Sequence, residues 1–215
     1  MRLDVWQDLH DDLRPGVQAD GETFAAAMGG KQLLLPIRTL PDGLRGVASL
    51  VLNQASFSVL DAIADHVAAQ LHPHAPDIIV AMPTLGLPLG EALARRLGHR
   101  RMVPLSTSRK FWYDDGLSTP ISSITSPDQV KQLYVDPRMV PLLQDARVAV
   151  VDDVLSSGKS MGAALSLMTK IGIAPHVIGC AMLQGETWRD VVGRTPVCHA
   201  IHTPILTKTK NGWTQ

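Results

Sequence analysis

The chain has 215 residues, with 20 lysines and arginines against 20 aspartates and glutamates, so its formal net charge is zero. A chain of this length can bury one sizeable α/β core with a small appended lobe. The balanced charge argues against a nucleic-acid partner, and no apolar stretch approaches the ~20 residues that a membrane-spanning helix requires. The first twenty residues lack the apolar core of a signal peptide, and two cysteines are too few for a disulfide framework. We therefore expect a cytoplasmic protein with reduced thiols.

The N-terminal part, residues 1–52, is expected to form a surface segment followed by a small β-rich hood. The first thirty residues show little pattern apart from an alanine-rich stretch at 24–28, which we interpret as a turn of helix closed by two glycines. Residues 31–38 and 44–52 are predicted to be two strands. They are joined by Pro41-Asp42-Gly43, whose residue types favour a reversal of the chain.

Residues 53–105 show helical and extended patterns in alternation. Apolar residues recur at helical spacing from Leu60 to Leu71 and again from Leu89 to Leu97. Short apolar strands are expected at 77–81 and 102–105. Helices placed between strands in this way are typical of a parallel sheet.

Residues 106–135 interrupt this alternation. They contain Arg109 and Lys110, three consecutive aromatic residues, and then a stretch rich in Gly, Ser, Thr and Pro. An excursion of this length inside a compact α/β unit is usually functional rather than a simple connection.

The strongest motif of the chain runs from Val148 to Met161. Four apolar residues predict a strand buried on both faces, Asp152 and Asp153 follow where it leaves the sheet, and a small hydroxyl-rich loop leads into a helix. A strand, a loop and a helix in this order direct backbone N–H groups and a helix N-terminus at an anion. The carboxylates would repel that anion, so we expect them to serve sugar hydroxyls or a cation beside it. A ligand that carries both a phosphate and a polyol fits this stretch best.

Two other interpretations of the motif are weaker. Gly158-Lys159-Ser160 is similar to the end of a Walker A loop, but that loop needs a glycine where this chain has Asp153, so ATP binding of that type is rejected. An ordinary strand-turn-helix crossover with two solvated aspartates is the plain alternative. The agreement of paired acids, a small loop and their position favours a binding site.

One more strand is expected at 177–183, and the tail at 185–215 has no clear pattern. The elements together predict an α/β fold with a mostly parallel sheet and helices on both faces. Ligands of such sheets bind at the carboxyl ends of the strands, so the loops at 84, 106 and 153 are expected to converge.

The 148–161 motif closely resembles the signature of type I phosphoribosyltransferases: four apolar residues, two acids, two apolar residues and a short loop of Thr, Ser and Gly. The resemblance covers residues 53–184, which would be the core that binds 5-phosphoribosyl-1-pyrophosphate (PRPP), with the tail packed on the core or the hood. It implies that Asp152 and Asp153 hold the ribose hydroxyls. The 5-phosphate would be wrapped by Ser156, Ser157, Gly158, Lys159 and Ser160. Lys159 departs from the family pattern, which usually has a second glycine there.

The same resemblance assigns roles to two other loops. Pro83-Thr84-Leu85-Gly86 stands where the family has its pyrophosphate loop, so the backbone of Thr84, Leu85 and Gly86 would meet pyrophosphate, with a non-proline cis peptide bond at Thr84–Leu85. Residues 106–135 match the family's flexible β-hairpin, which closes as a lid. Arg109 and Lys110 stand where the family places cations that meet pyrophosphate, often across a homodimer interface.

Within the family the chain is most similar to the xanthine and adenine phosphoribosyltransferases. Leu52-Asn53-Gln54 resembles the Leu-Asn-His-Gln segment of the xanthine enzymes, and residues 123–126 resemble the Ser-Phe-Thr piece of their hairpin. The base is expected to contact Asn53, Val154 and Leu183. The adenine enzymes have a glutamate in the hairpin, which this chain lacks. The xanthine enzymes have a lysine after the last strand, and this chain has Gln184-Gly185 there instead.

These observations predict a Mg²⁺-dependent enzyme that moves phosphoribose from PRPP to a purine-like base and releases pyrophosphate, with an oxopurine favoured slightly over adenine. Mg²⁺ would arrive with PRPP rather than bind to a cluster of protein ligands. Two alternatives stay open: a regulatory or scaffold protein that kept the PRPP site but lost catalysis, and an orotate-type transferase.

Overall fold

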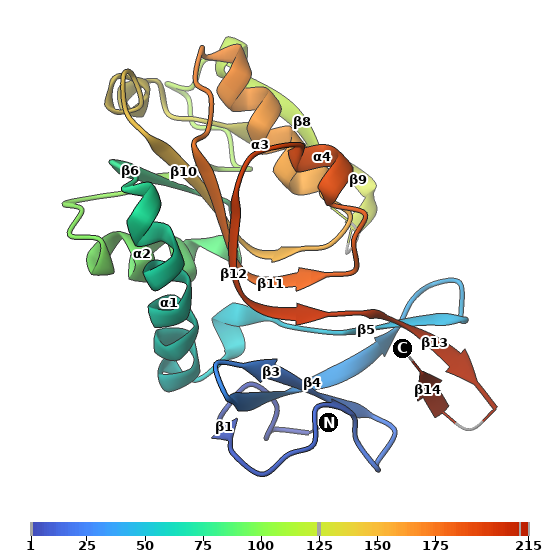
Figure 1. Ribbon diagram of the computed structural model, residues 1–215. Coiled ribbons are helices and arrows are strands. Elements are labelled where there is room, and N and C mark those ends of the chain that lie inside the picture. The colour runs from blue at the N-terminus through green and yellow to red at the C-terminus, as the bar shows by residue number, and fades with distance from the viewer. Residues whose placement is uncertain (1, 124–125, 211, 215) are drawn as a thin grey trace.

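The computed structural model describes residues 2–123, 126–210 and 212–214, with the backbone alone described for residues 122, 123 and 126–130. Its centre is a parallel five-stranded sheet in the order β12-β11-β10-β6-β7 (Figure 1). The strands are β6 (Ile78–Ala81), β7 (Val103–Pro104), β10 (Val148–Leu155), β11 (Val177–Gln184) and β12 (Val197–Thr203). This confirms the predicted α/β class with a mostly parallel sheet.

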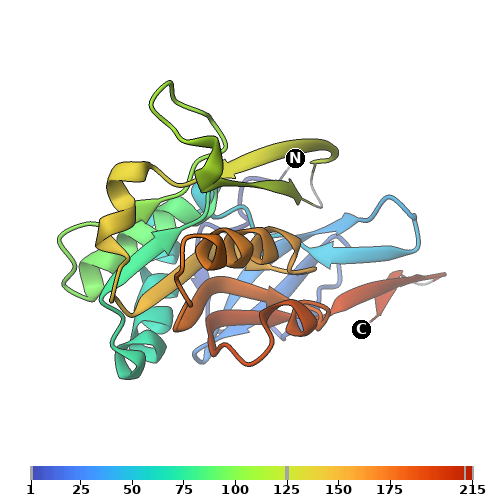
Figure 2. The same cartoon turned by 90° about the horizontal axis from the view of Figure 1, so that it is seen from above.

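Helices cover both faces of this sheet. On β10, Ala149 and Val151 pack in the apolar cluster that contains α1 (Phe57–Leu71) and α2 (Gly86–Arg96). Val148 and Val150 point the other way, into the cluster that contains α3 (Lys159–Lys170). Alternation of side chains along the strand therefore explains why the run is apolar on every residue. Figure 2 shows α3 lying across its face of the sheet.

The N-terminal part forms most of a second, antiparallel sheet of seven strands in the order β14-β13-β5-β4-β3-β2, with β1 also paired to β4; we call it the N-terminal sheet. The predicted strands and turn at 31–52 correspond to β4 and β5. The sheet consists of β1 (Leu9–His10), β2 (Gly16–Val17), β3 (Thr23–Met28), β4 (Lys31–Thr39), β5 (Arg45–Ala48), β13 (Ile205–Thr209) and β14 (Gly212–Thr214).

The predicted turn of helix at 24–28 is wrong, because these residues lie in β3. Phe24, Ala25 and Ala26 are buried, and the strand pairs with β4 over its whole length. Alanine favours a helix only weakly, and burial between neighbouring strands outweighs that preference.

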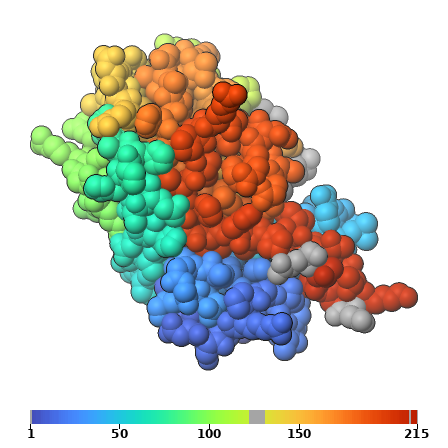
Figure 3. Space-filling view, in the orientation of Figure 1, coloured from blue at the N-terminus to red at the C-terminus, as the bar shows by residue number. Residues whose placement is uncertain are grey.

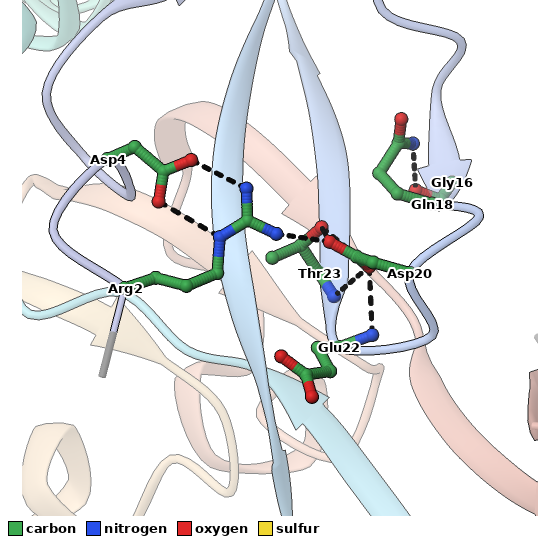
Figure 4. A network of polar contacts seen from close by, with 7 residues as sticks. All are labelled: Arg2, Asp4, Gly16, Gln18, Asp20, Glu22 and Thr23. Atoms are coloured by element: carbon green, nitrogen blue, oxygen red, sulfur yellow. Dashed lines mark hydrogen bonds and ion pairs between the residues drawn. The ribbon is translucent and has the colours of Figure 1, made fainter.

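The first residues are also better ordered than a patternless surface segment would be. The Arg2 guanidinium lies between the carboxylates of Asp4 and Asp20, and Asp20 accepts hydrogen bonds from the backbone N–H groups of Glu22 and Thr23 at 2.9 Å each (Figure 4). The buried Trp6 donates its indole N–H to the carbonyl of Ser49 at 2.8 Å. These bonds fix the segment against the N-terminal sheet.

The C-terminal tail, which had no clear pattern in the sequence, joins the two sheets. β12 pairs in parallel with β11 in the central sheet, and β13 then pairs antiparallel with β5 of the N-terminal sheet. The first and last parts of the chain consequently lie side by side on the surface (Figure 3).

The excursion at 106–135 contains a two-stranded antiparallel hairpin, β8 (Ser118–Ser123) and β9 (Ser126–Tyr134). The Lys170 ammonium at the end of α3 donates to the carbonyl of Ser118 at 3.0 Å. The remaining elements are the short helices η1 (Leu52–Gln54), η2 (His72–His74), η3 (Asp115–Leu117), η4 (Pro137–Leu142) and α4 (Arg189–Val192). None of the helices in the described ranges is long and apolar enough to cross a membrane.

Candidate active site

The two acids of the signature lie at the carboxyl edge of the central sheet. β10 continues to Leu155, four residues beyond the predicted end of the strand, so Asp152 and Asp153 belong to the strand itself. β6 accompanies β10 only as far as Val151, whereas β11 continues beside it to Leu155. The acids therefore stand just past the end of the neighbouring strand, where a sheet of this kind binds ligands.

Both carboxyl groups are buried, with Asp152 7 % and Asp153 9 % exposed. Burial raises the pKa of Asp152 well above its usual range, and the adjacent charge of Asp153 raises it further. Burial also raises the pKa of Asp153, whose backbone N–H donates to Asp152 Oδ1 at 2.9 Å. Among the described side chains no cation is paired with either acid. Two acids in this state favour a ligand that brings hydroxyl donors or a cation.

The loop at 156–160 leads directly into α3. Gly158 has φ +78°, and a Cβ there would lie 2.8 Å from Val191 Cγ2, so both the backbone and the space favour glycine. No side chain caps the start of α3, and the Lys159 N–H makes only a long hydrogen bond of 3.4 Å to Ser157 Oγ. Backbone donors at the beginning of this helix are therefore available to an anion.

The loop at 84–86 packs directly on the acid pair. A Cβ on Gly86 would lie 2.9 Å from the Cα of Asp152 and 3.0 Å from its Oδ1, so only glycine allows this approach. α2 begins at Gly86, again with no capping side chain. The predicted convergence of the loops at 84 and 153 is thus confirmed, and it brings the uncapped start of α2 to the pair of acids.

The cis peptide bond was predicted one residue too late. It lies between Pro83 and Thr84 rather than between Thr84 and Leu85. Leu85 is already helical, with φ −79° and ψ −24°, so the irregular link from β6 to α2 precedes it.

Arg109 and Lys110 are not brought to the acids in this structure. The Arg109 guanidinium pairs with Asp115 of its own loop, with Nε 2.8 Å from Oδ1 and Nη2 3.2 Å from Oδ2, and Lys110 is exposed. Farther along, the indole N–H of Trp112 donates to Asp136 Oδ2 at 3.2 Å. In the described parts of the chain, no hydrogen bond or ion pair links these cations to the loops at 84–86 or 156–160.

The predicted base-contacting residues lie in three different environments. Asn53 is exposed in η1, at the entrance to α1. Val154 is half-buried against the cluster that includes the N-terminal sheet, whereas Leu183 is buried in the cluster on the α3 face. Val154 and Leu183 therefore point to opposite faces of the sheet. Residues 124 and 125 of the predicted hairpin motif lie outside the described residues.

Sequence reasoning missed the support that the 156–160 loop receives from the last residue of β11 and from the segment that follows it. Gln184 is buried, its Oε1 accepts from the Ser156 hydroxyl at 3.1 Å, and its Nε2 donates to the carbonyl of Ala48 at 2.9 Å. Thr187 Oγ1 donates to the carbonyl of Ser156 at 3.2 Å, and the backbone of Trp188 lies against Gly158. The available signal was a lone polar residue at the end of the apolar run 177–183.

A family model described as "Phosphoribosyl transferase domain" matches residues 49–191 of the chain. The xanthine phosphoribosyltransferase of Chloroflexus aurantiacus is 31% identical over 118 residues, which cover 53% of this chain and 52% of that protein. The match thus spans only about half the length of this curated relative.

Solved structures give the same picture of the fold. The adenine phosphoribosyltransferase of Giardia lamblia, in complex with 9-deazaadenine, superposes with a TM-score of 0.61 at 22% identity, covering 78% of this chain and 93% of that one. The adenine phosphoribosyltransferase of Rhodothermus marinus has a TM-score of 0.58 at 18% identity, covering 78% and 94%. At these identities the likeness establishes the fold alone.

Proposed function

The chain belongs to the phosphoribosyl transferase domain family, as its signature predicts, and on that premise we propose that it is an enzyme transferring phosphoribose from PRPP to a purine-like base. The observation that supports this most directly is the contact of Gly86 with Asp152. It brings the uncapped start of α2 to the buried acids, and the uncapped start of α3 follows the same acids along the chain through the 156–160 loop. PRPP carries a 5-phosphate and a 1-pyrophosphate separated by a ribose, which is the order of groups that this arrangement accommodates.

Each group of PRPP has a matching part of the site. The 5-phosphate would lie at the start of α3, held by backbone N–H groups of residues 157–160 and by the side chain of Lys159, an exposed residue that begins the helix. The ribose hydroxyls would donate to Asp152 and Asp153. The pyrophosphate would lie at the start of α2, over the backbone of Thr84, Leu85 and Gly86.

The chemistry then depends on charge. Negative charge accumulates on pyrophosphate as its bond to the ribose breaks, and N–H donors fixed at the start of α2 stabilise it without reorganisation. Positive charge develops on the ribose ring, and the carboxylates of Asp152 and Asp153 stabilise it while they hold the hydroxyls. Exclusion of water protects the anomeric carbon from hydrolysis.

The acid pair also fits Mg²⁺ delivered with PRPP. In the described structure no cation lies beside these buried carboxyl groups. Mg²⁺ is a hard ion that prefers oxygen ligands, so its charge would be favourable next to them. In the described residues, no group of three His, Cys, Asp or Glu side chains forms a separate metal site. When bound with PRPP, Mg²⁺ would neutralise part of the pyrophosphate charge.

We assign the base to the space between the acids and the N-terminal sheet, which serves as the hood. Val154 points to that side, and Asn53 provides a polar group that can both donate and accept. Leu183 faces the opposite cluster, so we do not place it against the base. An oxopurine is favoured slightly over adenine, since the relative with 31% identity is a xanthine phosphoribosyltransferase. In this division residues 1–52 form the hood, 53–184 the PRPP core, and 185–215 tie the two together.

The loop at 106–117 and the β8–β9 hairpin serve as the lid in this proposal. Because Arg109 pairs with Asp115 here, reaching pyrophosphate requires closure of this segment or donation of the cations to a second subunit of a homodimer. Exposed ion pairs are weak, so exchanging Asp115 for a multiply charged leaving group is favourable.

The decisive experiment measures pyrophosphate release from PRPP and Mg²⁺ with xanthine, guanine, hypoxanthine, adenine and orotate in parallel. We expect turnover with at least one oxopurine and none with orotate. Tight PRPP binding without turnover of any base would instead identify a regulatory protein, and turnover of orotate alone would overturn the purine assignment.

A further inference from the structure

Gln184 is a single side chain that joins the two halves of the proposed site. It ends β11 and is only 6 % exposed. On one side its Nε2 donates to the carbonyl of Ala48 in β5 at 2.9 Å, and on the other its Oε1 accepts from Ser156 Oγ at 3.1 Å. The N-terminal sheet and the 156–160 loop are therefore linked through one amide.

The partners determine which atom of the Gln184 amide donates and which accepts. The carbonyl of Ala48 can only accept, so the NH₂ group of Gln184 must face it and its oxygen must face Ser156. The Ser156 hydroxyl has one proton, which it donates to Gln184. While this bond is intact, Ser156 has no proton to donate to a phosphate oxygen.

Ser156 is held on the side of the loop that faces the end of β11 and the segment after it. The Ser156 carbonyl accepts a hydrogen bond from Thr187 Oγ1 at 3.2 Å. Gly158 of the same loop lies against Val191 and the backbone of Trp188. Turning the hydroxyl toward a ligand would leave the buried oxygen of Gln184 without this donor, which opposes the turn.

We propose that Gln184 is a positioning residue that couples the hood to the 5-phosphate loop, and that Ser156 acts as its partner and not as a phosphate ligand. This inference rests on the proposed function and deepens it. PRPP binding fixes the loop, the loop fixes Gln184, and Gln184 fixes β5 beside the base. The 5-phosphate is then held by residues 157–160, with Ser156 removed from the predicted set.

The test is a double-mutant cycle of Gln184→Leu, Ser156→Ala and the double variant. The dissociation constant of PRPP is measured by calorimetry without a base, and the KM of the base is measured by turnover. Each single variant should weaken PRPP binding by about three- to tenfold, the range for one lost hydrogen bond, and Gln184→Leu should also raise the KM of the base. The double variant should bind PRPP no more weakly than the weaker-binding of the two single variants.

Gln70→Leu is the matched control. Gln70 also bridges two elements, since its Nε2 donates to the carbonyl of His199 at 2.6 Å and its Oε1 accepts from the His199 N–H at 3.2 Å. Gln70→Leu should lower the melting temperature and leave both the dissociation constant of PRPP and the KM of the base unchanged. Ser156→Ala removes one oxygen from a half-buried site, so it remains measurable if Gln184→Leu fails to fold. By the proposed coupling it should also raise the KM of the base, and an unchanged KM of the base would overturn the coupling.

The outcomes separate the two proposals. If the wild type binds PRPP but the two variants act additively, or if Ser156→Ala weakens binding while Gln184→Leu does not, then Ser156 contacts phosphate directly and the coupling is wrong. If the wild type does not bind PRPP, the proposed function fails, and this inference fails with it.

Discussion

Asp152 is a buried acid, and its burial costs the protein stability. A carboxyl with a raised pKa binds its proton more tightly in the folded state, so the free energy of unfolding falls as pH rises above the unfolded pKa of about 3.9. Asp152→Asn removes this penalty. We expect the variant to be more stable than the wild type at pH 7, with the difference vanishing toward pH 4, and to turn over at least tenfold more slowly because charge-assisted bonds to ribose are lost.

Asp136 is the control with the opposite sign. It is as buried as Asp152, but a hydrogen bond from Arg138 lowers its pKa. Asp136→Asn should therefore lose stability at pH 7 and approach the wild type in acid. Urea unfolding at several pH values measures both curves. A neutral-pH loss of stability in Asp152→Asn would contradict the assignment of an uncompensated acid.

Gly158 allows a second prediction, because another glycine with a similar positive φ lies far from the site. Gly158 and Gly98 have φ +78° and +75°, but a Cβ on Gly98 would meet no atom within 4 Å, whereas on Gly158 it would meet Val191 at 2.8 Å. Both alanine variants should lose roughly 1 kcal/mol or more from the strain. Only Gly158→Ala should also weaken PRPP binding, by about tenfold or more, in calorimetric titration. Equal PRPP affinity in the two variants would show that the loop does not hold the phosphate.

Arg109 tests the proposed lid. Its pair with Asp115 is exposed, and such pairs contribute little to stability. Arg109→Ala should leave the melting temperature nearly unchanged and lower kcat by tenfold or more if the guanidinium meets pyrophosphate after closure. Arg95, paired with Glu91 on the surface of α2, is the matched control, and Arg95→Ala should change neither quantity. Amide exchange of residues 106–117 should slow on adding PRPP. Equal exchange with and without PRPP would count against closure.

The elements show which parts of the fold the sequence could predict. Local patterns sufficed for α1, α3 and the apolar first half of β10, since burial on both faces and helical periodicity are visible within a few residues. They failed for β3, whose alanines are buried by partners elsewhere in the sheet. They also failed for the pairing of β13 with β5, which joins residues more than 150 positions apart. Gln184 was missed for the same reason, because its partners Ala48 and Ser156 come from distant segments.

At the scale of the whole molecule, the two sheets share one core. Leu33 and Leu35 of the N-terminal sheet pack in the same apolar cluster as Ile63 of α1 and Val151 of the central sheet. Domains with separate cores can unfold separately, whereas a shared core couples them. The N-terminal sheet, which is the proposed hood, is thus continuous in packing with the central sheet. The hydrogen bond from Gln184 to Ala48 therefore joins two parts of one packed core.

Leu206 of β13 tests this continuity. Its side chain is fully buried in the shared cluster, although it lies near the end of the chain and pairs with the outer part of the N-terminal sheet. Leu206→Ala should lower the free energy of unfolding by about 2–5 kcal/mol through lost burial and the cavity left behind. Since the core is common, calorimetry should show the single transition of the wild type moved to lower temperature, with the van't Hoff and calorimetric enthalpies still equal. A new early transition confined to the N-terminal sheet would show that the hood unfolds independently of the sheet that carries the acids.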